Sequence, residues 1–185
     1  MLDAPDVLVV LDQLEQVGLV VWLDGGWGVD ALVGHRSRPH QDLDLVIARD
    51  DCAAAQQALS GMGFQADLTA VPGLPARLVL VDATDRQVDL HRVIFDGHGN
   101  GWQDLGEDAW GAYPAEELTG VGMIGGRQVR CVTPQLQVRH HLGYPLKATD
   151  RHDLGLLAER FEVAVPPTIQ LPSHGHRPDR SSDPP

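Results

Sequence analysis

The first apolar pattern along the chain is helical. Helix-start signals stand at Asp3 and Pro5, and Gly18 ends the segment. Four apolar residues between these points recur at the spacing of one helix face: Val7, Leu8, Leu11 and Leu14. The pattern predicts a helix that packs its apolar face against a core.

A short strand, a glycine pair and a second helix are predicted next. The valine-rich run 19–23 has the length of a buried strand, and Gly25 and Gly26 interrupt the apolar pattern after it. A helical pattern follows over 27–32, and Gly34 can cap its end. Glycines let a ligand approach the backbone closely, and the free N–H groups of a turn and helix start favour an anion such as phosphate. The turn therefore suits a nucleotide.

Strict alternation marks the segment 42–47 as a strand with two different faces. Leu43 and Leu45 lie on one face, and Asp42 and Asp44 lie on the other. Two carboxylates held close together repel each other unless a cation lies between them, which points to a hard divalent metal such as Mg²⁺. The alternative is an exposed strand face that happens to be acidic.

The rest of the chain alternates further strand and helix patterns. We expect, in chain order, a helix at 50–59, a short strand at 64–68, a hairpin of 77–81 with 87–94, a second hairpin of 118–124 with 128–132, and helices at 134–142 and 150–161. The segment 95–114 reads as a loop. Because long loops often carry substrate contacts, we expect it to form a lid on the substrate side.

The composition is that of an acidic globular protein. Its 185 residues, 43% hydrophobic and 22% charged, suffice for one domain, or for one domain with a small helical appendage. No apolar run approaches the length of a membrane span, and the first residues lack the pattern of a signal peptide, so we expect a cytoplasmic protein without membrane contact. Cys52 and Cys131 fit neither a disulfide framework nor metal-ligand spacing, and we expect buried thiols.

The formal net charge of −12 limits the class of ligand. Proteins that bind long nucleic acids do so through clustered lysine and arginine, so such a partner is not expected. A ligand of nucleotide size is still allowed. The acidic balance would attract a cationic substrate, although solubility explains it equally well.

The motifs around the glycine pair and the aspartate strand resemble a known group of enzymes. Gly25-Gly26-Trp27, followed by Arg38, His40, Asp42 and Asp44 in an Arg-x-His-x-Asp-Leu-Asp pattern, resembles the antibiotic nucleotidyltransferases of the polymerase-β-like superfamily. The segment 22–30 looks very like the opening motif of the lincosamide nucleotidyltransferases, whereas the aminoglycoside enzymes share only the sparser elements. The resemblance covers roughly the first 160 residues and is densest up to Ile47.

This resemblance implies an α+β fold, in which a small mixed sheet is flanked by helices and followed by C-terminal helices. It implies a nucleotidyltransferase catalytic domain at 1–132 and a helical extension at 133–163. The proline- and serine-rich segment 164–185 has no part in the resemblance, and its composition predicts disorder. The family also makes a homodimer an expectation.

The resemblance further implies a set of site residues. Gly25, Gly26, Arg38 and His40 would bind the nucleotide, because a permanently charged guanidinium can neutralise triphosphate oxygens. Asp89 interrupts an apolar strand, where a charge needs a partner or a metal unless the residue faces water. The lincosamide enzymes have a similar Asp-x-His on this strand, which matches Asp89 and His91, and in the family's terms Asp89 is the third carboxylate.

Several further positions have two interpretations. Asp30 could meet the basic loop 35–38 or face solvent, and we favour a structural role. Lys147 could contact phosphate, but a solvated surface lysine is the simpler interpretation. Gly143 with Tyr144, and Asp150 with Asp153, look like landmarks in the C-terminal region of the lincosamide enzymes.

The function predicted from the sequence is metal-dependent transfer of an NMP group from an NTP to a hydroxyl of a small-molecule antibiotic, with release of pyrophosphate. Asp42 and Asp44 would hold one or two Mg²⁺ ions, and Asp89 would act as a base or as a ligand of a second ion. A lincosamide is the first acceptor candidate and an aminoglycoside the second. The alternative is a non-catalytic or antitoxin-type module that binds or modifies a partner protein, although all three carboxylates are present. Transfer to an RNA end is disfavoured by the acidic charge.

Overall fold

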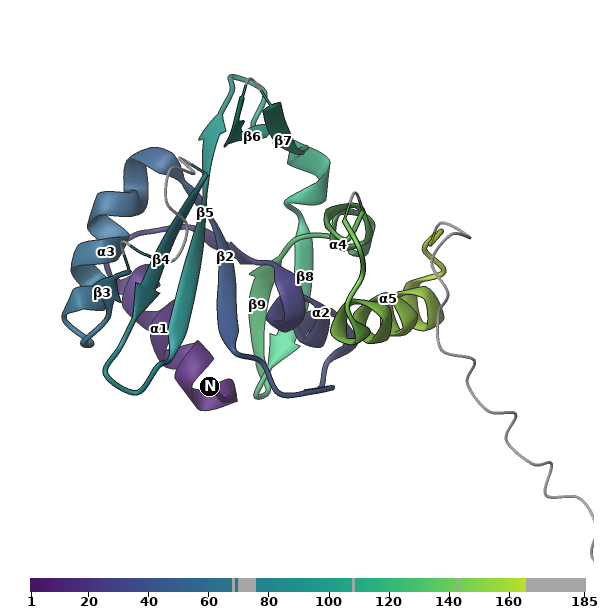
Figure 1. Cartoon of the computed structure of the whole chain (residues 1–185), viewed down its shortest axis with the longest axis horizontal. Helices are drawn as coiled ribbons and strands as arrows, with labels where there is room; N and C mark the ends of the chain where they lie inside the picture. The colour runs from purple at the N-terminus through teal and green to yellow at the C-terminus, as the bar shows by residue number, and fades with distance from the viewer. Residues whose placement is uncertain (68, 70–75, 108, 143, 166–185) are drawn as a thin grey trace, which may run out of the picture.

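The computed structural model describes residues 1–67, 69, 76–107, 109–142 and 144–165. Its helices are α1 (Ala4–Gln16), α2 (Gly25–Val33), α3 (Cys52–Ser60), α4 (Pro134–His140) and α5 (Ala148–Phe161). Its strands are β1 (Val21–Leu23), β2 (Asp42–Ala48), β3 (Gln65–Ala66), β4 (Arg77–Val81), β5 (Gln87–Phe95), β6 (Gly101–Gly106), β7 (Ala109–Tyr113), β8 (Gly120–Ile124) and β9 (Arg127–Cys131). The sheet and its helices form the mixed α+β arrangement that was predicted (Figure 1).

The sheet is mixed, and its central pairing brings distant aspartates together. The strand order is β3-β4-β5-β2-β1-β9-β8, with the β6–β7 hairpin extending from β5. β1 is antiparallel to β2 and parallel to β9, whereas β2 and β5 are parallel neighbours. In the register of β2 with β5, Asp44 lies opposite Asp89. Two residues far apart in the sequence thus share one position of the sheet.

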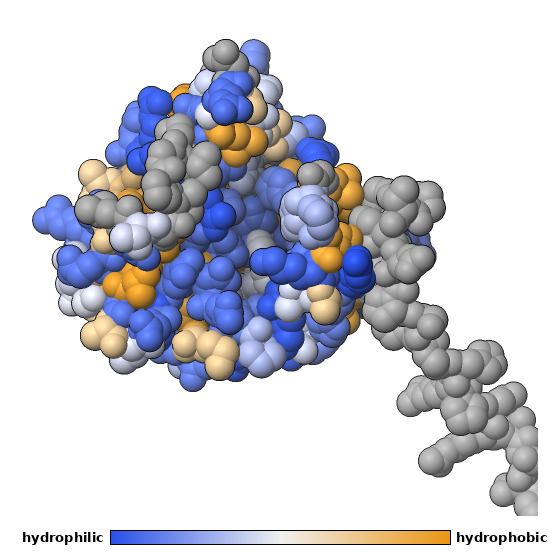
Figure 2. Space-filling model, viewed as in Figure 1, coloured by the Kyte–Doolittle hydropathy of each residue, from blue (hydrophilic) through white to orange (hydrophobic). Residues whose placement is uncertain are grey.

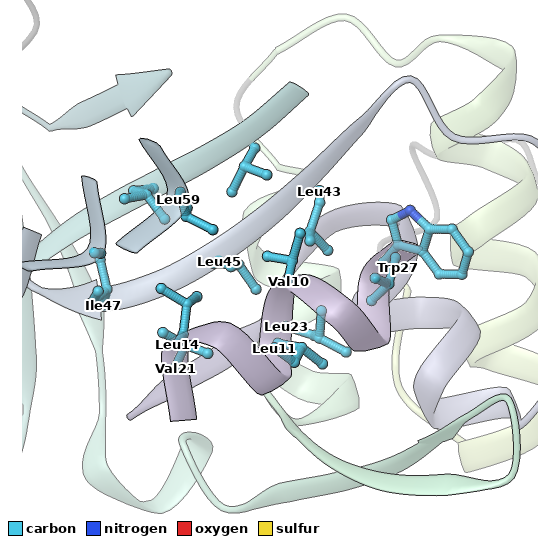
Figure 3. Close-up of a cluster of buried hydrophobic side chains, with 14 of the residues drawn as sticks. Val10, Leu11, Leu14, Val21, Leu23, Trp27, Leu43, Leu45, Ile47 and Leu59 are labelled. Atoms are coloured by element: carbon cyan, nitrogen blue, oxygen red, sulfur yellow. The ribbon is translucent and has the colours of Figure 1, made fainter. Parts of the chain in front are cut away.

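Alternation along the strands separates a dry face from a polar face. Leu43, Leu45 and Ile47 of β2 are fully buried in the main core, together with apolar residues of α1, α2 and α3 (Figure 3). Burial of a large aliphatic side chain stabilises the fold by about 1.5–3 kcal/mol, so this layer anchors β2 firmly. Asp42 and Asp44 therefore project from the opposite face, as predicted from the period of two.

The second helix begins earlier than the sequence pattern suggested. We expected a turn at the glycine pair and a helix from Trp27, but Gly25 and Gly26 are the first residues of α2. Asp24 caps the helix, since its carboxylate accepts a hydrogen bond of 2.8 Å from the Gly25 N–H. At the other end Gly34 adopts the left-handed conformation, as expected for a helix cap.

Both predicted hairpins are confirmed, and one predicted loop is wrong. β4 pairs with β5 and β8 pairs with β9, each antiparallel. The segment 95–114, expected to be a loop, instead contains the antiparallel hairpin of β6 and β7. Its alternation was hard to read because glycines interrupt it and because Trp102 and Trp110, its largest apolar side chains, are exposed. Gln103 and Tyr113 are the side chains that it buries instead.

The two C-terminal helices pack onto α2. Val29 of α2 forms a buried cluster with Val138 of α4 and with Leu154 and Leu157 of α5. The boundary at residue 132 stays a prediction, while Gly143 and the tail from 166 onward lie outside the described residues. Within the described part of the chain, no helix combines the length and the apolar character that a membrane span requires.

Both cysteines are buried, as predicted. Burial raises the pKa of the Cys52 thiol to about 11 and that of the Cys131 thiol to about 12. Both side chains therefore behave as small apolar groups of the core.

Candidate active site

The polar face of the sheet lines a cavity of about 1030 Å³. Its walls come from the start of α2, from β2, from the β6–β7 hairpin, and from α4 with the segment that leads into α5. Figure 2 shows this side of the molecule hollowed near its centre, with mostly hydrophilic residues around the hollow. A cavity of this size accommodates a nucleotide or a drug-sized ligand.

The predicted carboxylates meet at this cavity. Asp42 and Asp44 line it, and Asp89 lies beside Asp44 on the neighbouring strand. Asp44 is 16% exposed, whereas Asp89 is fully buried. Burial, and then the charge of Asp44, raise the pKa of Asp42 above its ordinary value. Like charges so close together require a compensating cation.

Arg77 is the residue that supplies positive charge at this point. It lines the cavity, and its Nη2 forms an ion pair with Asp89 Oδ2 and lies 3.8 Å from Asp44 Oδ1. Asp89 Oδ1 is buried and has no hydrogen-bond partner among the described residues. A buried carboxylate oxygen left in this way is expensive unless something binds it. The carboxylate oxygens of this site, including the unpaired Asp89 Oδ1, are suitable ligands for a divalent cation. In this structure the Arg77 guanidinium supplies the positive charge beside them.

Two histidines, His91 of β5 and His140 of α4, each lie beside an aspartate near the cavity. His91 Nε2 lies 3.2 Å from Asp44 Oδ1, and His91 Nδ1 lies 3.2 Å from the Tyr113 hydroxyl. His140 Nδ1 is 2.9 Å from Asp24 Oδ2. Burial opposes ionisation of Asp24, but the charge and hydrogen bond of His140 outweigh it and hold the Asp24 pKa below its ordinary value. Asp24 therefore stays ionised as the helix cap.

The glycine pair is required by the close approach of other side chains. Gly25 has a φ of +56°, and a Cβ there would lie 2.2 Å from Asp44 Oδ2. A Cβ at Gly26 would lie 2.3 Å from His40 Nδ1 and 2.6 Å from Arg38 Nη2. The space that these glycines leave open thus holds the side chains of the predicted site.

Replacing Gly25 by alanine is expected to displace Asp44 and to reduce turnover by about 10²-fold, because a misplacement of about 1 Å at a reacting group has that effect. Gly34→Ala at the other end of α2 is the matched control, since its φ is +84° and nothing lies within 4 Å of the added Cβ. Both changes should lower the free energy of unfolding by about 1–2 kcal/mol through the left-handed backbone. Urea unfolding measures the effect on stability, and pyrophosphate release measures the effect on turnover. Equal activity in the two variants would contradict the role of Asp44 in catalysis.

Arg38 lies at the cavity and is held by α5. It lines the cavity, and its Nε and Nη2 donate to the two carboxylate oxygens of Asp153 at 2.9 and 2.5 Å. The hydrogen bond with Asp153 raises the pKa of Arg38 further above its ordinary value. This bidentate contact fixes the guanidinium where a triphosphate could meet it.

His40 is buried beneath the glycine pair. Its Nε2 lies 2.5 Å from Asp30 Oδ2, and Asp30 Oδ1 accepts bonds from the backbone N–H and hydroxyl of Ser37. The structural role favoured for Asp30 is therefore confirmed. His40 is not among the described residues that line the cavity, and its nucleotide-binding role stays a prediction.

Arg38→Ala is expected to lower the free energy of unfolding by about 3–5 kcal/mol, because it leaves a buried carboxylate without its partner. Asp153 is 1% exposed, whereas Arg38 is 21% exposed and can reach water when its partner is removed. Asp153→Asn should therefore have the smaller effect, and it should recover part of the loss when combined with Arg38→Ala. Urea unfolding gives the free energy of unfolding of the two single variants and the double variant. Equal losses of stability in the two single variants would show that the Arg38–Asp153 pair contributes only as a surface contact.

The C-terminal landmarks also reach the cavity. Tyr144, Lys147, Asp150 and Asp153 all line it. Asp150 caps the start of α5, since its carboxylate accepts from the Lys147 N–H at 2.7 Å. Burial, followed by the charge of Asp150, raises the pKa of Tyr144 to about 12. The placement of Lys147 allows a phosphate contact, which stays a prediction.

Sequence reasoning missed some residues of this site and left others unassigned. Asp24 and Arg77 were not singled out, and His91 was quoted only as part of the Asp-x-His motif. Because Asp89 and His91 are two residues apart on β5, they point to the same face, and this spacing could have identified His91 as a site residue. Arg77 pairs with His91 across β4 and β5, so recognition of the hairpin register would have placed it there. No local signal links Asp24 to His140 of α4.

The chain is similar to known proteins along most of its length. A family model described as aminoglycoside-2''-adenylyltransferase matches residues 6–157. A lincosamide resistance protein of Staphylococcus haemolyticus is 27% identical over 149 residues, which cover 80% of this chain and 90% of that protein. The lincomycin-bound structure of the lincosamide antibiotic adenylyltransferase LnuA has a TM-score of 0.71 at 27% identity, covering 82% of this chain and 93% of that one. The complex of ANT(2'')-Ia with adenylyl-2''-tobramycin has a TM-score of 0.65 at 18% identity, covering 84% and 87%, which is a likeness of fold.

Proposed function

The chain belongs to the aminoglycoside-2''-adenylyltransferase family, and on that premise we propose that it transfers an adenylyl group from ATP to a hydroxyl of an antibiotic, with release of pyrophosphate. It is a nucleotidyltransferase, as its relatives are. A lincosamide is the first acceptor candidate and an aminoglycoside the second. An antibiotic modified in this way would lose a hydroxyl that its target requires.

One observation carries the proposal. The parallel pairing of β2 with β5 sets Asp44 beside the buried Asp89, and Asp44 itself lies next to the glycine start of α2 at the cavity. Carboxylates at a helix N-terminus would repel an anionic ligand, so their presence there makes sense when a cation accompanies that anion. A metal–triphosphate complex has this combination of charges.

The metal requirement is part of the proposal. Asp42 and Asp44 would hold Mg²⁺, and Asp89 would be their third partner. When bound there, Mg²⁺ would offset negative charge on the phosphoryl oxygens and on the pyrophosphate.

The chain's own residues would bind and orient the two substrates. Gly25 and Gly26 at the start of α2 line the cavity, and free N–H groups in a helix's first turn would favour phosphate oxygens. Arg38, fixed by Asp153, would pair with the same triphosphate, and Lys147, which also lines the cavity, would be a further cation. Both substrates would thus be held before any bond is broken.

Asp89 would act at the acceptor hydroxyl. The hydroxyl oxygen forms a bond to the α-phosphorus, the bond from that phosphorus to the pyrophosphate breaks, and the hydroxyl proton passes to a carboxylate. Asp89 is fully buried and paired with Arg77, which lines the cavity, so Arg77 would have to move before Asp89 could meet the hydroxyl. Arg77 is 36% exposed and has the freedom for such a movement.

The acceptor would lie against the β6–β7 hairpin. The residues of this hairpin that line the cavity are uncharged: Gln103, Leu105, Gly111, Ala112 and Tyr113. An aminoglycoside carries several ammonium groups that need carboxylate partners, whereas a lincosamide carries fewer charges and more apolar surface. The uncharged wall therefore favours the lincosamide, with the hairpin in the place of the predicted lid.

A panel experiment tests the proposal. Each nucleoside triphosphate is combined with lincosamides and aminoglycosides in the presence of Mg²⁺, and pyrophosphate release and the mass of the product are measured. We expect ATP with a lincosamide to give the largest turnover. Absence of turnover on every acceptor, together with a stoichiometric partner protein that copurifies, would instead support the antitoxin-type module.

A homodimer, a cytoplasmic location and the absence of binding to long nucleic acids also remain predictions.

A further inference from the structure

The side chains best arranged for one cation differ from those predicted. Ligand atoms of Asp44, Asp89 and His91 all lie within 4.8 Å of one another, the one such trio found in the described part of the chain. Asp42, expected to share the ion with Asp44, does not belong to this trio. The third candidate donor is therefore an imidazole nitrogen and not a carboxylate oxygen.

A chain of hydrogen bonds orients this imidazole. Gln103 Nε2 donates to the Ala76 carbonyl at 3.1 Å, and Gln103 Oε1 accepts from the Tyr113 hydroxyl at 3.3 Å. Because the Tyr113 proton is used there, its oxygen can only accept from the neighbouring ring nitrogen. His91 Nδ1, 3.2 Å away, therefore carries the hydrogen.

This tautomer leaves the Nε2 lone pair of a neutral His91 directed at Asp44. The two atoms are 3.2 Å apart, and both are acceptors, so nothing in the pair attracts them. Two donor atoms at this separation could bind one ion together, because nitrogen and oxygen ligands lie about 2.0–2.2 Å from such a metal. Histidine ligands usually donate their other ring N–H to a fixed partner, as His91 does to Tyr113.

We propose that His91 Nε2, together with Asp44 and Asp89, is a ligand of a divalent ion, and that this nitrogen gives the site a preference for a transition metal such as Co²⁺ over Mg²⁺. The inference rests on the proposed function in that it names the ligands of the same site. Imidazole suits first-row transition metals, whereas an all-oxygen site suits Mg²⁺. Arg77 holds the position of this ion in the metal-free chain and competes with it for Asp89.

The test measures metal affinity in the full-length chain without nucleotide or acceptor. Isothermal titration gives the Co²⁺ affinity, and competition gives the Mg²⁺ affinity. In His91→Asn the ratio of the two should fall by at least about tenfold, because Co²⁺ loses the nitrogen donor and Mg²⁺ loses little. His140→Asn is the matched control from the same cavity and should keep the ratio. Any Co²⁺ held by His174 and His176 of the tail is common to all three proteins.

A second readout starts from the unaltered chain. Pulsed electron paramagnetic resonance of bound Mn²⁺ should show coupling to an imidazole ¹⁴N, and that coupling should disappear in His91→Asn but persist in His140→Asn. If His91 is instead an imidazolium that donates to Asp44, the metal ratio stays unchanged in His91→Asn and no such coupling appears, which overturns the inference. Nitrogen coupling without nucleotidyl transfer would support the inference while removing the proposed function.

Discussion

Replacing Asp44 by asparagine is expected to reduce nucleotidyl transfer by about 10³-fold or more. The metal bound to the triphosphate stabilises charge in the transition state by several kcal/mol, and each 1.4 kcal/mol is about tenfold in rate. A neutral amide is a much poorer ligand for a hard cation than a carboxylate. Asp42→Asn should follow the same direction, and the larger loss should come from Asp44, which belongs to the close trio with Asp89.

The fold should survive this substitution. The substitution removes the repulsion of Asp44 by Asp42 and Asp89 and also its attraction to Arg77, and these two effects on stability oppose each other. We expect the free energy of unfolding to change by about 1 kcal/mol or less. Pyrophosphate release and urea unfolding are compared with those of Asp50→Asn, whose side chain is 92% exposed. Near-normal turnover in folded Asp44→Asn would remove the metal assignment.

Local patterns predicted the parts of the fold that depend on local physics. The period of two in 42–47 separated Asp42 and Asp44 from Leu43 and Leu45, because alternate side chains of a strand must point to opposite faces. Gly34 ends α2 as expected, and Thr133 caps the start of α4. Motif resemblance supplied what such patterns lack, namely that Asp89 belongs with the first two carboxylates.

Contacts between distant segments were beyond such reasoning. The pairing of Arg38 with Asp153, and of Asp24 with His140, depends on how α4 and α5 pack onto α2. No periodicity in the sequence encodes that packing angle. The β6–β7 hairpin was read as a loop for a related reason, since exposed tryptophans and glycines conceal its alternation. Arg77 was missed because its role follows from a strand register and not from its neighbours in the sequence.

Replacing Asp89 by asparagine should affect turnover far more than nucleotide binding. The motivation is the position of Asp89: it is fully buried, lies opposite Asp44 in the sheet, and has one oxygen with no partner among the described residues. Its contribution would arise as the hydroxyl attacks, so kcat should fall while the Kd for ATP stays within a few-fold. Loss of a positioned base is worth about 10²–10⁴-fold, and loss of a metal ligand could exceed this.

Because Asp89 is buried, a loss of activity in Asp89→Asn is informative only if the variant still folds. Asparagine has nearly the shape of aspartate, and Arg77, at 36% exposure, can turn to solvent when its ion pair is removed. The variant should therefore fold, which thermal unfolding checks. Asp44→Asn serves as the comparison, because a residue that holds the metal–nucleotide complex should lose ATP affinity as well as turnover.

The pH dependence and metal dependence of the residual activity separate the two roles of Asp89. If Asp89 is the base, activity of the unaltered chain rises with pH through one ionisation, and Asp89→Asn lacks that rise. If Asp89 is a metal ligand, raising Mg²⁺ or substituting Mn²⁺ recovers part of the deficit, because the remaining donors still bind the ion more weakly. Loss of ATP binding and turnover together would assign Asp89 to the nucleotide site. The acceptor hydroxyl would then have to meet its base elsewhere, and the β6–β7 hairpin, whose Gln103 and Tyr113 line the cavity, would be the wall to search.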